Sequence, residues 1–237
     1  MHRATKAGIV GFAAVSLLAA LISCSHRPAG DSTAGTGTLS DSDCRARLEG
    51  ARTIEIRRAV IALEKKYAVY SDGVRVGSVT GRVLPLFGDT FTMSSLNGTP
   101  LLSEKEVKRA FRFSIDRLAL ITDPNSGREI GFIAQNQWRD LFNWGIVFHV
   151  YDLNQNELGQ ARQQFSFFLK ESSISGMDEG VLRPEYTVKE LFRPFQKTYD
   201  ISVSSGPHSV SAETAVLLAC IEDAIWSAKH GKSPKRK

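Results

Sequence analysis

The stretch SAETAVLLACIEDAIWSAKH, Ser211–His230, decides the fold because its middle has no polar side. From Thr214 to Ile221 there is no charged residue over more than two helical turns. A helix that lies on a protein surface has one apolar stripe and one polar face. This segment is therefore predicted to be a helix that other elements surround, with Glu222 and Asp223 emerging at the edge of the enclosure.

The chain before this helix is patterned as antiparallel hairpins. Asp-Gly and Asn-Gly adopt the positive φ of tight turns, so apolar alternation on both sides of such a turn predicts a β-hairpin. Four turn signals with apolar alternation on both sides lie at Val69–Val76, which contains Asp-Gly, at Met93–Thr99, which contains Asn-Gly, and at Leu120–Gly127 and Val150–Asn156. Three are followed by an apolar residue and glycine, namely Val76-Gly77, Ile130-Gly131 and Leu158-Gly159, which indicates a loosely repeated hairpin unit.

Alternation at Phe111–Ile115, Ile146–Val150 and Phe165–Leu169 adds further strands. Ser103–Glu106 fits a helix capping box, but few apolar residues at helical spacing follow it, so a strand is preferred. A short helix is predicted at Tyr186–Phe192, ended by Pro194. The predicted fold class is mainly β, a closed antiparallel barrel of about 12 strands around the hydrophobic C-terminal helix, because closure buries the helix and removes exposed sheet edges.

The first residues have the pattern of an export signal. Arg3 and Lys6 precede 17 uncharged residues, Ala7 to Ser23, a run shorter than a membrane-spanning helix needs. Leu21-Ile22-Ser23-Cys24 resembles the lipobox of bacterial lipoproteins. That resemblance implies diacylglyceryl transfer to the Cys24 thiol, cleavage before Cys24 and acylation of the new amino terminus. Plain secretion and an uncleaved anchor remain alternatives.

The leader also sets the predicted domains and location. They are a signal peptide at 1–23, the lipidated Cys24 and a flexible tether over 24–49, a barrel domain at 50–230 and a basic disordered tail at 231–237. The tether is predicted because Ser25–Asp43 is rich in Gly, Ser, Thr, Ala and Asp. The expected location is the bacterial cell envelope, and in a Gram-negative cell the periplasmic face of the outer membrane, because Ser25 is not acidic.

Hairpins around Asp-containing turns, followed by an apolar helix that closes with Ile221-Glu222-Asp223-Ala224, resemble the tubby C-terminal-like superfamily, especially its LURP-one-related branch. The resemblance spans about residues 50 to 228 and implies a twelve-stranded barrel threaded by the helix. Tubby members of that superfamily bind membrane phosphoinositides, scramblase relatives are linked with lipid movement and plant members with defence. No ligand-binding residue of the superfamily maps onto this sequence.

Candidate chemical sites are sparse. Asp152, Asn154 and Asn156 have the spacing of calcium ligands in an EF-hand, but Glu157 and Gln163 stand where that loop has Gly and Glu, so a hairpin turn is preferred and no metal is predicted. His149 and His208 are single histidines, more typical of packing or surface positions than of catalysis. The sequence has no nucleophile elbow or Gly-rich phosphate loop. A non-enzymatic protein without a cofactor is therefore predicted.

Partners are indicated by charge and aromatic content. The net charge of +5 comes from the two ends of the chain, and the body is nearly balanced, so no nucleic-acid partner is expected. Trp138, Phe142 and Trp144 would form a contact surface for a membrane or an envelope protein, or a loop folded over the barrel mouth. Cys44 and Cys220 would form a disulfide in an oxidising compartment, or remain free if Cys220 packs as a small hydrophobe.

Two functions follow from this pattern. The first is a lipid-anchored binding or interaction scaffold near the membrane of the cell envelope. The alternative is a carrier or sensor of a hydrophobic small molecule or lipid held inside the barrel. The two differ in whether the helix fills the interior.

Overall fold

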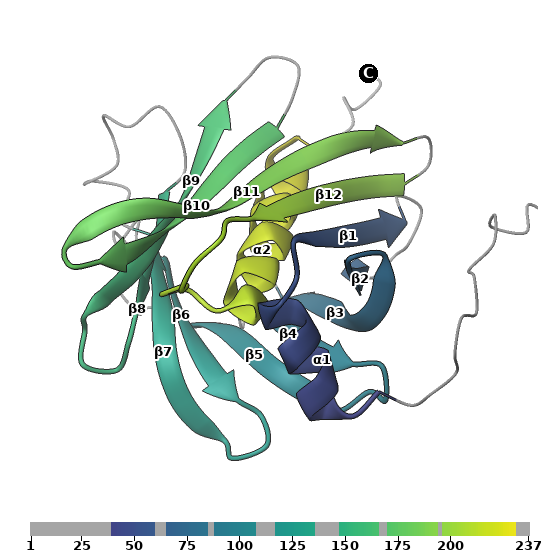
Figure 1. Ribbon diagram of the computed structural model, residues 1–237, viewed down its shortest axis with the longest axis horizontal. Helices are drawn as coiled ribbons and strands as arrows, with labels where there is room; N and C mark the ends of the chain where they lie inside the picture. Colours follow the sequence, from purple (N-terminus) through teal and green to yellow (C-terminus); the bar gives the residue numbers. More distant parts are fainter. Residues whose placement is uncertain are drawn as a thin grey trace, which may run out of the picture. The chain divides into compact units, whose positions relative to one another are not determined.

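The structure, a computed structural model, describes residues 39–59, 65–84, 88–107, 117–135, 147–165, 170–193 and 196–230. Twelve strands form a closed antiparallel barrel, and a helix runs through its middle (Figure 1). The predicted fold class is confirmed. Along the part of the chain that the structure describes, no helix is long and apolar enough to cross a membrane.

The strands follow the order of the chain around the barrel. Each pairs antiparallel with its neighbours, and β1 pairs with both β2 and β12, which closes the wall. The bounds are β1 Thr53–Ala59, β2 Lys65–Ser71, β3 Val74–Leu84, β4 Gly88–Ser95, β5 Pro100–Val107, β6 Arg117–Asp123, β7 Arg128–Gln135, β8 Val147–Tyr151, β9 Glu157–Phe165, β10 Lys170–Asp178, β11 Val181–Arg193 and β12 Gln196–Val203. The helices are α1, Asp41–Glu49, and α2, Ala212–His230.

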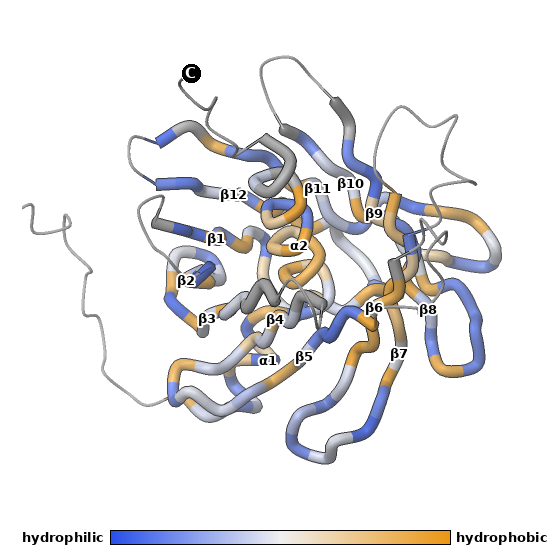
Figure 2. The backbone as a smooth tube through the Cα atoms, turned by 180° about the vertical axis from the view of Figure 1, so that it is seen from behind, coloured by the Kyte–Doolittle hydropathy of each residue, from blue (hydrophilic) through white to orange (hydrophobic). Residues whose placement is uncertain are grey.

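The helix α2 is surrounded, as its composition predicts. Every residue from Ala212 to Ile225 is buried, and Leu217 and Leu218 have no exposed surface. The tube of α2 is hydrophobic where it crosses the middle of the barrel (Figure 2). The wall supplies inward apolar side chains against it, among them Ile54, Ile56, Val69, Phe91, Met93, Ile133, Phe148, Ile174 and Ile201.

The start of α2 is held by a buried carboxylate. Glu185 of β11 accepts hydrogen bonds from the backbone N–H groups of Ser209 at 2.6 Å and Val210 at 3.0 Å. The hydroxyl of Tyr186 donates to the carbonyl of Val210 at 2.8 Å. These bonds satisfy backbone groups that would otherwise be buried without partners, and they fix where the chain turns into the barrel.

The predicted tether ends earlier than expected, because its last nine residues form α1. Ser40 caps the helix, and its hydroxyl and the carboxylate of Asp43 make reciprocal bonds with backbone N–H groups. Cys44 and Leu48 are buried, and α1 contacts α2 and β3. The prediction of a flexible segment up to residue 49 is therefore wrong for 41–49. Residues 24–38 of the predicted tether lie outside the described residues.

Two predictions about local structure have opposite outcomes. The strand preferred at Ser103–Glu106 is confirmed as part of β5. The short helix predicted at Tyr186–Phe192 is wrong, because these residues belong to β11 and pair with both β10 and β12. Pairing on both sides and burial of Tyr186 and Val188, with Lys189 exposed, favour the strand over any local helical preference.

All four predicted hairpins are present, and a fifth turns at Glu179-Gly180. The repeated glycine has a steric cause. A Cβ on Gly77 would lie 2.3 Å from the carbonyl oxygen of Ser94 in the next strand, and a Cβ on Gly131 would lie 2.5 Å from that of Tyr151. Each glycine pairs with the residue just before a register shift. The glycines therefore permit the tight approach of neighbouring strands where the wall bends.

Because the strands alternate in direction, five hairpin turns share one end of the barrel. These are β2–β3, β4–β5, β6–β7, β8–β9 and β10–β11, and we call this end the α1 end. The helix α1 lies there, since the hydroxyl of Ser71 donates to the carbonyl of Arg47 at 2.8 Å and the guanidinium of Arg45 donates to that of Leu101 at 2.6 Å.

Candidate functional site

Two groups of side chains meet opposite faces of α2. The first, which we call the Asp223 cluster, consists of Asp223 on α2, Arg58 on β1, Tyr67 on β2, and Lys197 and Tyr199 on β12. It lies where the first and last strands pair to close the barrel. Arg58 is directly opposite Tyr67 on one neighbouring strand and Lys197 on the other, so the register brings these three side chains together.

The carboxylate of Asp223 has no exposed surface and receives donors on both oxygens. The hydroxyl of Tyr199 donates to Oδ1 at 2.5 Å, and the ammonium of Lys197 donates to the same atom at 3.2 Å. The hydroxyl of Tyr67 donates to Oδ2 at 2.9 Å. The guanidinium of Arg58 forms an ion pair with Oδ2 as well.

The electrostatics of the cluster favour the ionised carboxylate. Burial by itself raises the pKa of Asp223, but the hydrogen bond from Tyr199 and the charges of Lys197 and Arg58 outweigh it and lower the pKa to about 2. Burial, followed by the charge of Asp223, raises the pKa of Tyr199. Burial likewise raises the pKa of Tyr67. The phenols are therefore donors at neutral pH and not bases.

The Asp223 cluster has a structural role, because its hydrogen bonds and ion pairs attach α2 to the closing strands. A buried carboxylate that accepts from four side chains of the wall and from the Ser227 hydroxyl of α2 has little capacity left for a substrate. Two cations and two phenols on three strands all bind one residue of α2, so the cluster joins the helix to the closing strands. The expected emergence of Glu222 and Asp223 at the edge of the barrel is wrong, since both are buried and Asp223 forms an ion pair with Arg58.

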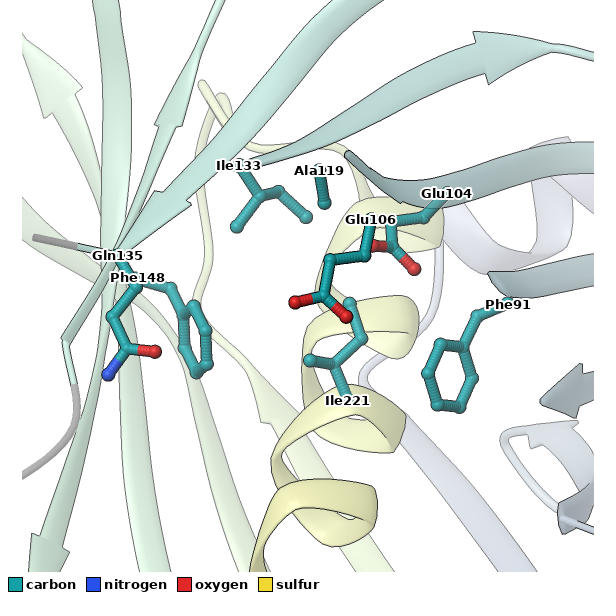
Figure 3. Close-up of a pocket in the computed structure, with 8 residues that line it drawn as sticks. All are labelled: Phe91, Glu104, Glu106, Ala119, Ile133, Gln135, Phe148 and Ile221. Atoms are coloured by element: carbon teal, nitrogen blue, oxygen red, sulfur yellow. The ribbon is translucent and has the colours of Figure 1, made fainter. Parts of the chain in front are cut away.

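The second group faces the other side of α2 and lines a cavity of about 20 Å³, which we call the Ile221 cavity (Figure 3). Its lining is Phe91, Glu104, Glu106, Ala119, Ile133, Gln135, Phe148 and Ile221. Glu104 and Glu106 alternate on β5, and both point from that strand toward the helix. The volume accommodates about one water molecule.

The predicted contact residues and lipidation site are outside the described part of the chain. Trp138, Phe142 and Trp144 fall within residues 136–146, and Cys24 falls within residues 1–38. The membrane or partner contact and the lipid anchor stay predictions.

The two remaining cysteines are free thiols. Cys44 on α1 and Cys220 on α2 are both buried, and no disulfide joins them. Of the two alternatives from the sequence, the structure has the free, packed thiols. Cys220 behaves as a small apolar side chain in the core.

The other candidates take structural roles in hairpins and loops. Asp152 accepts hydrogen bonds from the backbone and side-chain amides of Asn156, both at 2.8 Å, so the hairpin interpretation of this loop is confirmed. His149 is buried, and its Nδ1 is 2.7 Å from a carboxylate oxygen of Glu157. His208 packs its ring against Tyr186, with centroids 5.1 Å apart.

Sequence analysis missed the partners of Asp223, although a signal for them exists. Arg58 continues the inward phase of Ile54 and Ile56 on β1. On β12, Tyr199 is two residues from Ile201 and points to the same inward face. A charged residue in phase with an apolar strand face indicates a buried polar partner. Which carboxylate supplies it depends on how α2 is rotated in the barrel, and no local pattern encodes that rotation.

Comparisons with known proteins do not assign this chain to a family. No protein-family model matches the sequence, and no curated protein matches it. A solved X-ray structure of a protein from Arabidopsis thaliana is similar over 81% of this chain and 99% of that chain, with 11% identity and a TM-score of 0.46.

Proposed function

We propose that this protein is a non-enzymatic, lipid-anchored scaffold of the bacterial cell envelope, whose tubby-like barrel is a rigid body that presents its loops to an envelope partner. One observation carries the proposal, namely that α2 fills the barrel. Among the described residues, α2 is buried against the wall from Ala212 to Ile225, which leaves little room beside it for a ligand.

The size of the interior cavity supports a scaffold over a carrier. Pockets for drug-sized ligands have volumes of about 300–1,000 Å³. The Ile221 cavity has about 20 Å³, and Ile221 of α2 forms part of its wall. A lipid or similar molecule inside the barrel would therefore have to displace the helix.

The Asp223 cluster opposes such a displacement. Moving α2 would separate Asp223 from Arg58 and Lys197 and leave charges in the core without partners. The start of the helix is held as well, through the bonds of Glu185 to the backbone of Ser209 and Val210. The helix is thus attached to the wall at two levels.

Mass spectrometry of the natively purified full chain tests both parts of the proposal. The intact mass is expected to carry acyl groups on Cys24, and an organic-solvent extract of the same sample is expected to contain no stoichiometric lipid. The covalent anchor stays on the chain during extraction, so the two measurements are independent. A bound lipid at one per chain would instead favour the carrier, and an unmodified Cys24 would refute the anchor.

A further inference from the structure

Large apolar side chains are exposed at the turns of the α1 end. They are Val74, Leu96, Ile130, Leu153, Val181 and Leu182, and their exposed fractions run from 39% for Leu182 to 57% for Val181. Each lies in a turn or within a few residues of one, and all five hairpins of this end contribute. Two other described apolar residues with comparable exposure, Val107 and Leu191, lie toward the opposite ends of β5 and β11.

The turns surround the place where the chain enters the fold. In Figure 1 the hairpins β4–β5, β6–β7, β8–β9 and β10–β11 fan out around α1 and the beginning of α2. The carbonyl of Leu39, the first described residue, accepts a hydrogen bond of 2.8 Å from the side-chain amide of Asn97 in the β4–β5 turn. The preceding segment therefore leaves from the α1 end.

The length of that segment limits how far this end lies from its anchor. Fifteen residues separate Cys24 from Leu39. A chain of that length spans at most about 50 Å when it is fully extended. If Cys24 carries acyl chains in a bilayer, the apolar turns stay within a few nanometres of the lipid surface. Weak contacts then form readily, because the effective concentration of lipid is high.

The charge of the turns selects the kind of lipid surface. Acidic residues at the five turns outnumber basic ones, with Asp72, Asp123, Asp152, Asp178 and Glu179 against Arg75, Arg128 and Arg183. Hydrogen bonds from Thr53 lower the pKa of Asp72, and hydrogen bonds within their own turns lower the pKa of Asp123 and Asp152, so these groups stay ionised at neutral pH. An anionic bilayer would repel such a surface, whereas zwitterionic headgroups would not.

We propose that the α1 end is a membrane-docking face, on which the apolar turn residues insert into the interface of a zwitterionic phospholipid bilayer. The inference rests on the lipid anchor of the proposed function. The anchor supplies attachment, and the turns set orientation, so the opposite end of the barrel points away from the membrane. When aliphatic side chains leave water and enter the headgroup region, the free energy of membrane binding becomes more favourable.

Nitroxide labels at two positions of one strand test the orientation. Val181→Cys places a label beside the β10–β11 turn, and Leu191→Cys places the matched control about 33 Å farther along β11. Cys44 and Cys220 are buried and shielded from the reagent. In the full acylated chain on phosphatidylcholine vesicles, access of a water-soluble relaxation agent to the label at 181 is expected to fall at least about threefold relative to free protein, with no change at 191.

The outcomes separate this proposal from the anchor. Flotation of the acylated chain with vesicles while the label at 181 stays fully accessible would overturn docking and leave the anchor intact. Stronger protection on phosphatidylglycerol-rich vesicles would overturn the zwitterionic assignment. An unacylated Cys24 in the intact mass would remove the basis of both. A further variant, Leu153→Asp with Val181→Asp, should still float but lose protection at a label on Leu96→Cys, with an unchanged melting curve.

Discussion

Ile221 and Asp223 are two residues apart on α2, yet they meet opposite surroundings. Ile221 borders a cavity between apolar rings and two glutamates, whereas Asp223 is enclosed by donors from β1, β2 and β12. The closing strands hold the helix by ion pairs and hydrogen bonds, and the far wall holds it by packing that leaves a small gap. The helix is therefore oriented mainly by its charged face, because directional bonds specify one rotation and apolar contacts tolerate several.

The largest effect is expected when the charged face loses its carboxylate. Asp223→Asn leaves Arg58 without its buried counter-ion and Lys197 with Glu190 alone, and should lower the free energy of unfolding by about 3–5 kcal/mol, measured by urea denaturation. Glu190→Gln is the matched control, because Glu190 meets the same Lys197 at 3.9 Å near the surface. That change should cost less than about 1 kcal/mol. Equal costs for the two variants would mean that the cluster does not orient the helix.

A smaller loss is expected when one donor is removed. Tyr199→Phe deletes the hydroxyl that donates to Oδ1 of Asp223 but keeps the ring, and should lower the free energy of unfolding by about 1.5–3 kcal/mol. Tyr186→Phe is a control on a neighbouring strand, since its hydroxyl donates to a neutral carbonyl. It should cost about 1 kcal/mol. A larger cost for Tyr186→Phe would contradict the importance of the buried charge.

Acid should weaken the same face. The pKa of Asp223 is lowered in the folded chain from 3.8 to about 2, so its contribution is complete above pH 4 and is lost as the pH falls through 2. The expected loss is about 2 kcal/mol, measured as the difference in unfolding free energy between the protein and Asp223→Asn across this range. The contribution of the turn aspartates to the pH dependence cancels in this difference, because they titrate in both proteins. A pH-independent difference would refute the lowered pKa.

The smallest effect is expected on the cavity side. Ala119→Val adds two methyl groups to the lining of the Ile221 cavity and should change the free energy of unfolding by less than about 1 kcal/mol. Ala161→Val makes the same change on β9, where Ala161 is fully buried and lies opposite Phe148. Overpacking there should lower the free energy of unfolding by about 1–3 kcal/mol, measured by thermal or urea denaturation. If both variants cost the same, the cavity is not a looser part of the core.

The sequence predicted the hairpins better than it predicted α1 and β11. Asp72-Gly73 and Asn97-Gly98 identified two of the hairpins because the positive φ that tight turns require is a local property. The helix α1 was missed because its apolar content is low, and only Cys44 and Leu48 are buried. The helix wrongly predicted in β11 shows the same limit, since pairing with two neighbouring strands decides the state of Tyr186–Phe192.

By itself, the sequence determined that a helix without a polar side must be enclosed, and that antiparallel hairpins must close around it, because apolar surface and unpaired strand edges are both costly in water. Only the tertiary structure decided which side of that helix meets Arg58, Tyr67 and Tyr199, and that the apolar turns gather at the end where the chain enters. Both depend on the register and closure of strands far apart in the chain, which no local pattern specifies.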